Sequence, residues 1–270
     1  MITNVNQRWR ERRASYRPAG EPIDTSRFEV GPLQADLAEA RAFVGRHHYQ
    51  RTWPAARESF GLYRSDQLVG VAVFGVPMQS KVITGCLPGD PLDHVELSRF
   101  VLLDEVPGNG ESWFLARCFA LLRLHGYRGV VSFSDPLPRS DSAGRVTTPG
   151  HVGCIYQAHN AVYLGQRARK TIYVLPDGRT FNGRTMSKLR GGEQGWRGAA
   201  RQLQAYGAPE LGRRPSDSAR RAWATRWLGQ LTTRVRHPGN HKYAWGLDRV
   251  TKRHLPQSLP YPKRHASLAA

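Results

Sequence analysis

The chain has 270 residues and a formal net charge of +19, from 40 Lys and Arg against 21 Asp and Glu. That length supports one large domain or two small ones, and a hydrophobic content of 40% excludes a wholly disordered chain. No run of about 18 apolar residues occurs, so no membrane-spanning helix is predicted. No apolar stretch follows the arginine-rich start, so a secretory signal is not expected. Three widely spaced cysteines argue against a disulfide framework and a CxxC-type zinc site, and favour a reducing, cytoplasmic setting.

The charge is distributed unevenly along the chain. Residues 1–20 contain five basic residues and one acidic residue, residues 21–183 contain 17 and 16, and residues 184–270 contain 18 and four. A nearly neutral body with basic ends is the pattern expected for a polyanionic partner, usually nucleic acid, although solvated or disordered tails share this composition. We expect three parts: a flexible basic arm at 1–27, a catalytic body at 28–187, and a basic helical extension and tail at 188–270 that binds DNA.

Apolar periodicity predicts alternating helices and strands in the body and further helices after it. This order predicts an α/β fold with a mixed central sheet flanked by helices. The expected elements are a helix at 33–44, a polar loop at 46–58, strands at 59–63, 68–76 and 95–103, a turn at 107–112, a helix at 113–125, a strand at 129–136, a polar loop at 137–152, a helix at 153–164, strands at 170–175 and 179–185, helices at 196–206 and 216–236, and a tail at 236–263 with little periodicity.

One junction is suited to an anionic ligand. A strand runs into Gly108-Asn109-Gly110 and then opens a helix, whose first backbone N–H groups favour negative charge. An ordinary loop with an Asn N-cap explains the same residues. The order of strand, turn, helix and strand, followed by the ending Asn160 to Gly165, is similar to that of acyltransferases of the GNAT type, so the sequence predicts a GNAT-like fold.

Seven motifs follow one another along residues 45–263: His48-Tyr49, Glu96-Leu97-Ser98-Arg99, Asn109-x-Glu111-Ser112, Val130-Val131-Ser132-Phe133-Ser134-Asp135, Gly153-Cys154-Ile155-Tyr156-Gln157-Ala158, Leu175-Pro176-Asp177-Gly178 and Pro238-Gly239-Asn240-His241-Lys242-Tyr243. Together they resemble the Mom family of phage DNA-modification proteins. Members of that family have a GNAT-like fold and convert adenine in DNA to N6-carbamoylmethyladenine, which hides phage DNA from host restriction enzymes. The resemblance implies the same transferase activity here, on double-stranded DNA in the host cytoplasm.

Adenine N6 is a poor nucleophile because its lone pair is delocalised into the ring, so a general base or an electrophilic clamp must assist. Asp135 is the first candidate because it follows an apolar strand, at the strand end where open α/β sheets bind ligands. Its carboxylate could accept the N6 proton or bind a metal, or the residue could simply start a turn before Pro136. Ser132 could hydrogen-bond the base or the donor, or be a core serine.

Arg99 lies in an otherwise apolar strand, where burial of a guanidinium is costly unless it is paired. It could hold an anionic donor or orient Asp135. Glu96 is three residues away, and strict alternation along a strand places its side chain on the opposite face, so we do not expect it to be the partner.

Aromatic and basic side chains meet in the loop at 46–58. His48 could act as a base or a metal ligand, and Tyr49 or Trp53 could stack on an extruded adenine; an exposed histidine and core-capping rings are the alternative. Tyr156 stands near the position where a GNAT tyrosine protonates a leaving thiolate, and it could equally be a core residue.

The donor-binding candidates are the residues of the glycine-rich turn. Its acidic side chain disfavours a pyrophosphate, so acetyl-CoA is not expected to be the donor, which stays unidentified. Iron or another divalent metal could bind at His48 and Asp135, with His151, but no HxH or HExxH spacing supports it. The turn residues are Gly108, Asn109, Gly110, Glu111 and Ser112.

Basic and aromatic side chains outside the site are candidates for DNA contacts, most of them to phosphate and without sequence information. Two other functions stay open: a CoA-dependent N-acyltransferase of a protein or small amine, and a non-catalytic DNA-binding protein. The DNA-binding candidates are Arg51, Trp53, Arg184, Lys188, Arg190, Arg220, Arg221, Lys242 and Arg253.

Overall fold

The structure is a computed structural model that describes residues 5–10, 13–18, 20–33, 37–77 and 79–263. Its contacts divide the chain into two compact units. We call the first unit the body; it comprises residues 1–136, 149–167 and 240–270. We call the second unit the basic module; it comprises residues 137–148 and 168–239.

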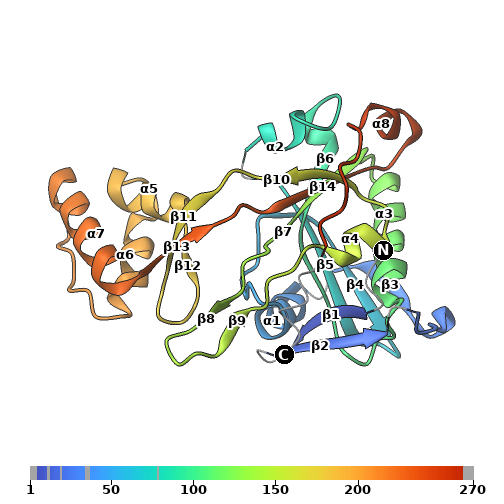
Figure 1. Cartoon of the computed structure of the whole chain (residues 1–270), viewed down its shortest axis with the longest axis horizontal. Helices are drawn as coiled ribbons and strands as arrows, with labels where there is room; N and C mark the ends of the chain where they lie inside the picture. Colours follow the sequence, from blue (N-terminus) through green and yellow to red (C-terminus); the bar gives the residue numbers. More distant parts are fainter. Residues whose placement is uncertain (1–4, 11–12, 19, 34–36, 78, 264–270) are drawn as a thin grey trace. The chain divides into compact units, whose positions relative to one another are not determined.

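A seven-stranded sheet forms the centre of the body, in the order β10-β14-β7-β6-β5-β4-β3 (Figure 1). Neighbouring strands are antiparallel except β6 and β7, which pair in parallel over four residues. Helix α3 connects these two strands, as a parallel pair requires. The predicted mixed α/β fold is therefore confirmed.

Helices cover both faces of this sheet. The apolar stripe of α3, from Phe114 to Leu122, packs with Phe60, Phe74 and Val130 on one face. On the other face, Phe43 and Val44 of α1 pack with side chains of β5 and β6. Alternating side chains of β5 enter both cores, which explains why this strand is apolar on both sides.

The body contains β1 (Val5–Arg10), β2 (Arg13–Pro18), β3 (Glu29–Pro32), α1 (Leu37–His47), β4 (Ala56–Arg64), β5 (Gln67–Gly75), α2 (Lys81–Thr84), β6 (His94–Leu102), α3 (Gly110–Leu124), β7 (Gly129–Ser134), α4 (Cys154–Ala158), β10 (Val162–Gln166), β14 (His241–Gly246) and α8 (Arg249–His254), with 3-10 turns at Thr25–Arg27 and Pro91–Asp93. No helix in the described part of the chain combines the length and apolarity needed to cross a membrane.

The basic module has its own sheet and core. Its three-stranded sheet has the order β12-β11-β13, and a separate hairpin pairs β8 with β9. Leu189, Leu203 and Leu228 from three helices meet in one core with Phe181. The elements are β8 (Arg139–Ser140), β9 (Val146–Thr148), β11 (Lys170–Val174), β12 (Thr180–Phe181), α5 (Gly183–Gly191), α6 (Trp196–Gln204), α7 (Asp217–Leu231) and β13 (Thr233–His237).

The structure differs from the sequence-based expectations mainly after residue 150. The helix expected at 153–164 ends at Ala158, and a strand follows because Asn160 turns the chain with a positive φ of 55°. The tail expected at 236–263 supplies β14, which lies between β10 and β7 in the sheet of the body. At the other end, the described part of the expected flexible arm forms the hairpin β1–β2.

Helix α7 packs within its own unit. Its Trp223 and Trp227 contact the core of the basic module, and its buried positions are Arg220, Ala224 and Leu228.

Candidate active site at the end of the parallel strand pair

The parallel pairing of β6 and β7 ends at Leu97 and Ser132. Beyond this point β6 is paired with β5 and β7 is paired with β14. The hydroxyl of Ser132 donates to the carbonyl oxygen of Leu97 at 2.9 Å, so a side chain satisfies the last carbonyl of the pair. Polar side chains from β6, β7, α4 and the loop after α1 interact around this point. We call these residues the site cluster: His48, Tyr49, Glu96, Arg99, Ser132 and Tyr156.

A β-bulge in β6 brings two charged side chains of the site cluster to one face. Val73 pairs with Arg99 and Phe74 pairs with Leu97, so Ser98 is an extra residue between them. One extra residue reverses the alternation of side chains beyond it. Glu96 and Arg99 therefore share a face and interact electrostatically, and the prediction that they point to opposite faces is wrong.

The Arg99 guanidinium donates hydrogen bonds to oxygen atoms of two chain segments, the loop after α1 and strand β6. It donates to the carbonyl oxygen of Thr52 at 2.9 Å, to the Thr52 hydroxyl at 3.0 Å and to the carbonyl oxygen of Ser98 at 2.6 Å. Burial lowers the pKa of Arg99, while the nearby Tyr49, Glu96 and Tyr156 act in the opposite direction. The arginine thereby fixes the loop after α1 against β6.

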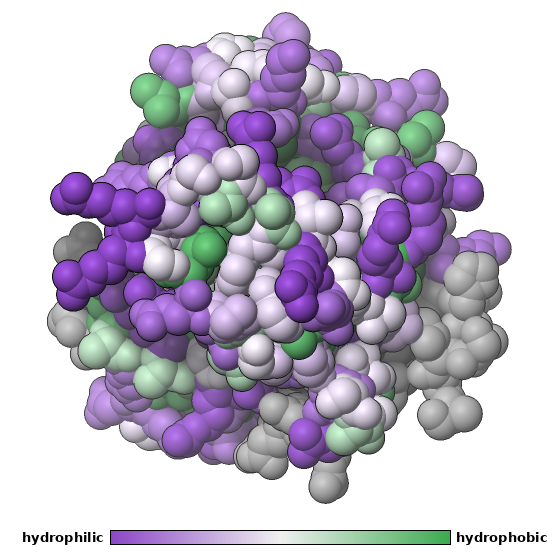
Figure 2. All heavy atoms as spheres, turned by 90° about the vertical axis from the view of Figure 1, so that its left-hand side faces the viewer, coloured by the Kyte–Doolittle hydropathy of each residue, from purple (hydrophilic) through white to green (hydrophobic). Residues whose placement is uncertain are grey.

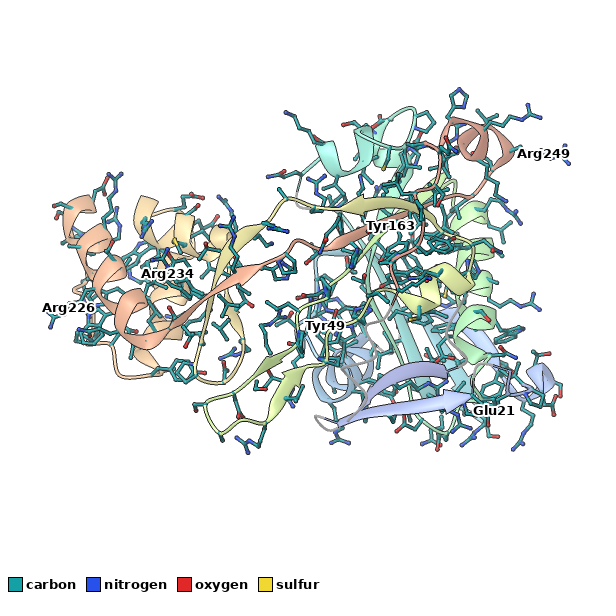
Figure 3. All side chains as sticks on the ribbon, viewed as in Figure 1. Glu21, Tyr49, Tyr163, Arg226, Arg234 and Arg249 are labelled. Carbon is teal, nitrogen blue, oxygen red and sulfur yellow. The ribbon has the colours of Figure 1, made fainter. Side chains whose placement is uncertain are left out.

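His48 and Tyr49 lie side by side in that loop. Their rings stack with centroids 4.4 Å apart, and the Tyr49 hydroxyl lies 3.3 Å from Nε2 of His151 (Tyr49 is labelled in Figure 3). Nδ1 of His48 accepts the backbone N–H of Gln50 at 3.0 Å. Burial, together with the nearby Arg99 and His151, holds the pKa of His48 well below its usual value. His48 is therefore a neutral imidazole at pH 7. Because it is buried, the alternative of an exposed loop histidine is wrong.

Tyr156 closes the site cluster from α4. It is buried, it lies within hydrogen-bonding reach of Ser132, and its ring centroid is 6.4 Å from that of His151. Burial raises the pKa of its hydroxyl, and Glu96 and Arg99 act on it in opposite directions. The site cluster thus joins Arg99, Ser132 and Tyr156, which we expected, with Glu96, which we did not.

Asp135 follows β7 directly and is buried. Its backbone carbonyl accepts the N–H of His151 at 2.8 Å, which ties the strand end to the segment that carries His151. The position at a strand end matches the expectation. We expected His151 only as a possible metal ligand, because its contact with Tyr49 depends on a turn that periodicity does not reveal.

The expected donor-binding turn is covered by the chain itself. The backbone N–H of Gly108 donates to a carboxylate oxygen of Glu21 at 2.7 Å (labelled in Figure 3). Glu111 forms a buried ion pair with Arg8 of β1 at 2.6 Å, and Arg8 also donates to the carbonyl oxygens of Leu103, at 2.8 Å, and Pro107, at 3.1 Å. The start of α3 thus already holds two carboxylates, those of Glu21 and Glu111, and this arrangement disfavours the binding of a pyrophosphate there. These residues do not fit the phosphates of acetyl-CoA.

The remaining residues of that turn belong to the helix start. Asn109 is the N-cap of α3 without a side-chain capping bond, Gly110 begins the helix, and Ser112 donates to the carbonyl oxygen of Asn109 at 3.1 Å. For a metal, no group of three or more His, Cys, Asp and Glu side chains suited to an ion is found among the described residues.

The residues expected to contact DNA fall into two groups. Lys242 is buried and its ammonium group donates to the carbonyl oxygen of Val82 at 2.7 Å, and Arg220 is buried with its guanidinium bonded to Asp217 and the carbonyl oxygen of Pro215. We expected both residues on a DNA-binding surface. This expectation is wrong, because Lys242 is buried in the body and Arg220 is buried in the basic module. The others are exposed or half-buried: Arg51, Trp53, Arg184, Lys188, Arg190, Arg221 and Arg253.

The fold and the site cluster together define a mixed α/β protein whose candidate ligand site lies where a parallel strand pair ends, the position at which open α/β sheets bind ligands. The chain belongs to the Mom protein family, whose profile matches residues 28–263.

Its sequence is 30% identical over 165 residues to the methylcarbamoylase Mom of Escherichia phage Mu. The aligned region is 58% of this chain and 61% of that protein, so the chain spans about three fifths of its relative's length. Among solved structures, a tandem GNAT protein from the clavulanic acid biosynthesis pathway covers 82% of this chain and 99% of its own, with 12% identity and a TM-score of 0.40. An N-acetyltransferase from Staphylococcus aureus Mu50 covers 43% of this chain and 56% of its own, with 18% identity and a TM-score of 0.27.

Proposed function

We propose that this protein is a transferase that converts adenine in double-stranded DNA to N6-carbamoylmethyladenine in the cytoplasm of the host cell and thereby protects phage DNA from restriction. Membership of the Mom family and the similarity to the methylcarbamoylase of phage Mu support the class of reaction. The observation that carries the proposal is the site cluster, which combines acid, base and aromatic side chains in one part-buried place.

A base within a duplex is out of reach of a protein side chain, so the target adenine must leave the base stack. In our proposal the extruded adenine stacks on Tyr49 or on Trp53, whose other face lies near the Arg41 guanidinium, 5.8 Å from the ring centroid. Arg99 and Tyr156 contact the donor and stabilise the charge on its leaving group, and Ser132 orients one of the two reactants. Asp135 fixes the position of the adenine amino group.

In this proposal the basic module binds the phosphates of the DNA duplex. It contains 17 Lys and Arg against five Asp and Glu, whereas the body contains 23 against 16. Figure 2, which views the molecule from the side of α5, α6 and α7, shows mainly hydrophilic side chains with scattered hydrophobic ones. Lys and Arg that neutralise phosphates release counterions, so such a surface binds DNA in a salt-dependent way. Exposed basic side chains include Arg197, Arg201, Arg213, Arg214, Arg221, Arg226, Arg234 and Arg236.

Mass spectrometry of nucleosides tests the proposal. A plasmid isolated from cells that produce the full chain is expected to contain N6-carbamoylmethyldeoxyadenosine and to resist restriction enzymes whose sites contain the modified adenine. Plasmid from cells with an empty vector is the control. Unaltered deoxyadenosine in the presence of soluble, folded protein contradicts the proposal, and turnover of acetyl-CoA without DNA would support the acyltransferase alternative instead.

A further inference from the structure

Glu96 is the acidic side chain of the site cluster. It lies on β6 at the last residues of the parallel pair, opposite Val131 of β7, and it is half-buried. Two titratable side chains interact with it electrostatically, Arg99 from β6 and Tyr156 from α4. The bulge at Ser98 is what places this carboxylate on the same face as Arg99.

Glu96 does not serve as the ion-pair partner of Arg99. The guanidinium donates to Thr52 and to the carbonyl oxygen of Ser98 rather than to Glu96. Among the described residues, none donates a hydrogen bond to the Glu96 carboxylate. A carboxylate withdrawn from water without such donors is costly to keep charged, and structures retain such groups mainly at functional sites.

We propose that Glu96 is the catalytic base that accepts the proton of the adenine amino group, an inference that rests on the proposed function. The donor is taken to be a carbamoylmethyl group whose methylene carbon carries an anionic leaving group. The bond from N6 to the methylene carbon forms while the bond from that carbon to the leaving group breaks, and its electron pair departs with the leaving group. One N6 proton moves to a carboxylate oxygen of Glu96, and the electron pair of the N–H bond stays on the nitrogen.

The environment of Glu96 suits this role. Burial raises its pKa to about 7, and Arg99 limits that rise. A base is most effective when its pKa lies near the working pH, because it is then both available and able to hold the proton. Asp135 lies after the end of β7 and keeps its proposed role in positioning the adenine.

The test compares four full-length proteins by the nucleoside assay on co-expressed plasmid: wild type, Glu96→Gln, Glu96→Asp and Glu58→Gln. Glu58 is the matched control, because its carboxylate lies on β4 and contacts His125 at 3.2 Å and Tyr127 at 3.3 Å outside the site cluster. We expect Glu96→Gln to lower the modified fraction of adenine at least a hundredfold, Glu96→Asp to retain a small part of it, and Glu58→Gln to match wild type.

Thermal unfolding at pH 8 separates a base from a structural residue. A carboxylate whose pKa is raised on folding destabilises the charged folded state, so its neutral replacement is expected to raise the unfolding temperature while the product disappears. Wild-type product levels with Glu96→Gln overturn the proposal, as does a lowered unfolding temperature together with lost product. Absence of product from the wild type contradicts the proposed function itself, which distinguishes the two failures.

Discussion

At the scale of single residues, the geometry of Arg99 matters more than its charge. Three bonds from one planar guanidinium reach two residues of different segments, Thr52 and Ser98. The ammonium group of lysine carries the same charge but cannot reproduce a planar fork of donors. Arg99 therefore positions the loop with Tyr49 in addition to any contact that it makes with the donor.

We expect Arg99→Lys to lower the modified fraction of adenine by tenfold or more in the nucleoside assay, because the loop after α1 loses its fixed position. Arg117→Lys is the matched control: Arg117 lies on α3 over the ring of Trp113, at 5.3 Å from its centroid, and this change should leave the product unaltered. Full activity of Arg99→Lys would show that charge alone suffices.

We expect Asp135 to contribute to the modification of adenine and not to the affinity for the DNA duplex. Asp135→Asn keeps the shape of the side chain and removes its charge, so modification should be lost while the affinity for a DNA duplex changes by no more than a few-fold. Nucleoside analysis and a fluorescence anisotropy titration measure the two effects. Unchanged modification would remove Asp135 from the site.

His48 links the site to pH. Folding lowers the pKa of His48. Below about pH 6.5 this side chain is therefore protonated in the unfolded chain and stays neutral in the folded chain. The free energy of unfolding should therefore fall as the pH drops below 6.5, by at most about 1.4 kcal/mol per pH unit from this residue.

His48→Asn retains an acceptor for the N–H of Gln50 and has no titrating group. Urea unfolding at pH 7.5, 6.5 and 5.5 is expected to show a shallower loss of stability for this variant than for wild type. Equal slopes would mean that His48 titrates alike in both states.

At the scale of elements, the hairpin β1–β2 and the start of α3 form one structural unit. Arg8 and Glu111 are both buried, with side chains 4% and 8% exposed, and Arg8 also binds carbonyl oxygens of the turn. Burial of either charge without the other is strongly unfavourable, because the remaining charge loses its solvation and its partner.

Removal of the buried cation should therefore destabilise the protein. We expect Arg8→Ala to lower the free energy of unfolding by about 3 kcal/mol or more in a urea titration. Arg17→Ala is the control: the ion pair of Arg17 with Glu21 is more exposed, and its loss should cost less than about 1 kcal/mol. Similar effects of the two changes would contradict the assignment of Arg8 as a buried structural residue.

Elements with strong periodicity were predictable and those that depend on pairing were not. The strands β4 to β7 and the helices α3 and α6 agree with expectation to within a few residues, because their apolar residues recur at the strand or helix period. Strand β14 is buried by neighbours that are distant in sequence, so no local pattern marks it. Glu96 was missed because strict alternation was assumed, and a bulge is set by the partner strand.

At the scale of the whole molecule, the charge is concentrated in an insertion and not in a C-terminal tail. The basic module leaves the body after Arg167 and returns at Asn240, and these two residues are joined by a backbone hydrogen bond of 2.8 Å. A truncation within the module would also remove β14 from the central sheet, so it could not test DNA binding alone.

An internal deletion gives a cleaner experiment. We expect replacement of residues 168–239 by Gly-Gly to leave a folded body that binds a DNA duplex more weakly, with a smaller slope of log affinity against log salt concentration, because phosphate contacts set that slope. Anisotropy titrations at several salt concentrations measure it, and circular dichroism monitors the fold. An unchanged slope would place the phosphate contacts on the body.

The position of β14 also governs the order in which the protein can be completed during synthesis. The ribosome must make the entire basic module before residues 241–246 emerge, and until then β7 lacks its neighbour on one side. A nascent chain therefore exposes the unpaired edge of β7 while about 100 residues are synthesised, and an exposed edge can pair with a wrong strand. Ser132 of the site cluster lies on β7 opposite Tyr243 of β14, so the sheet around the site cluster is completed only after β14 has been translated.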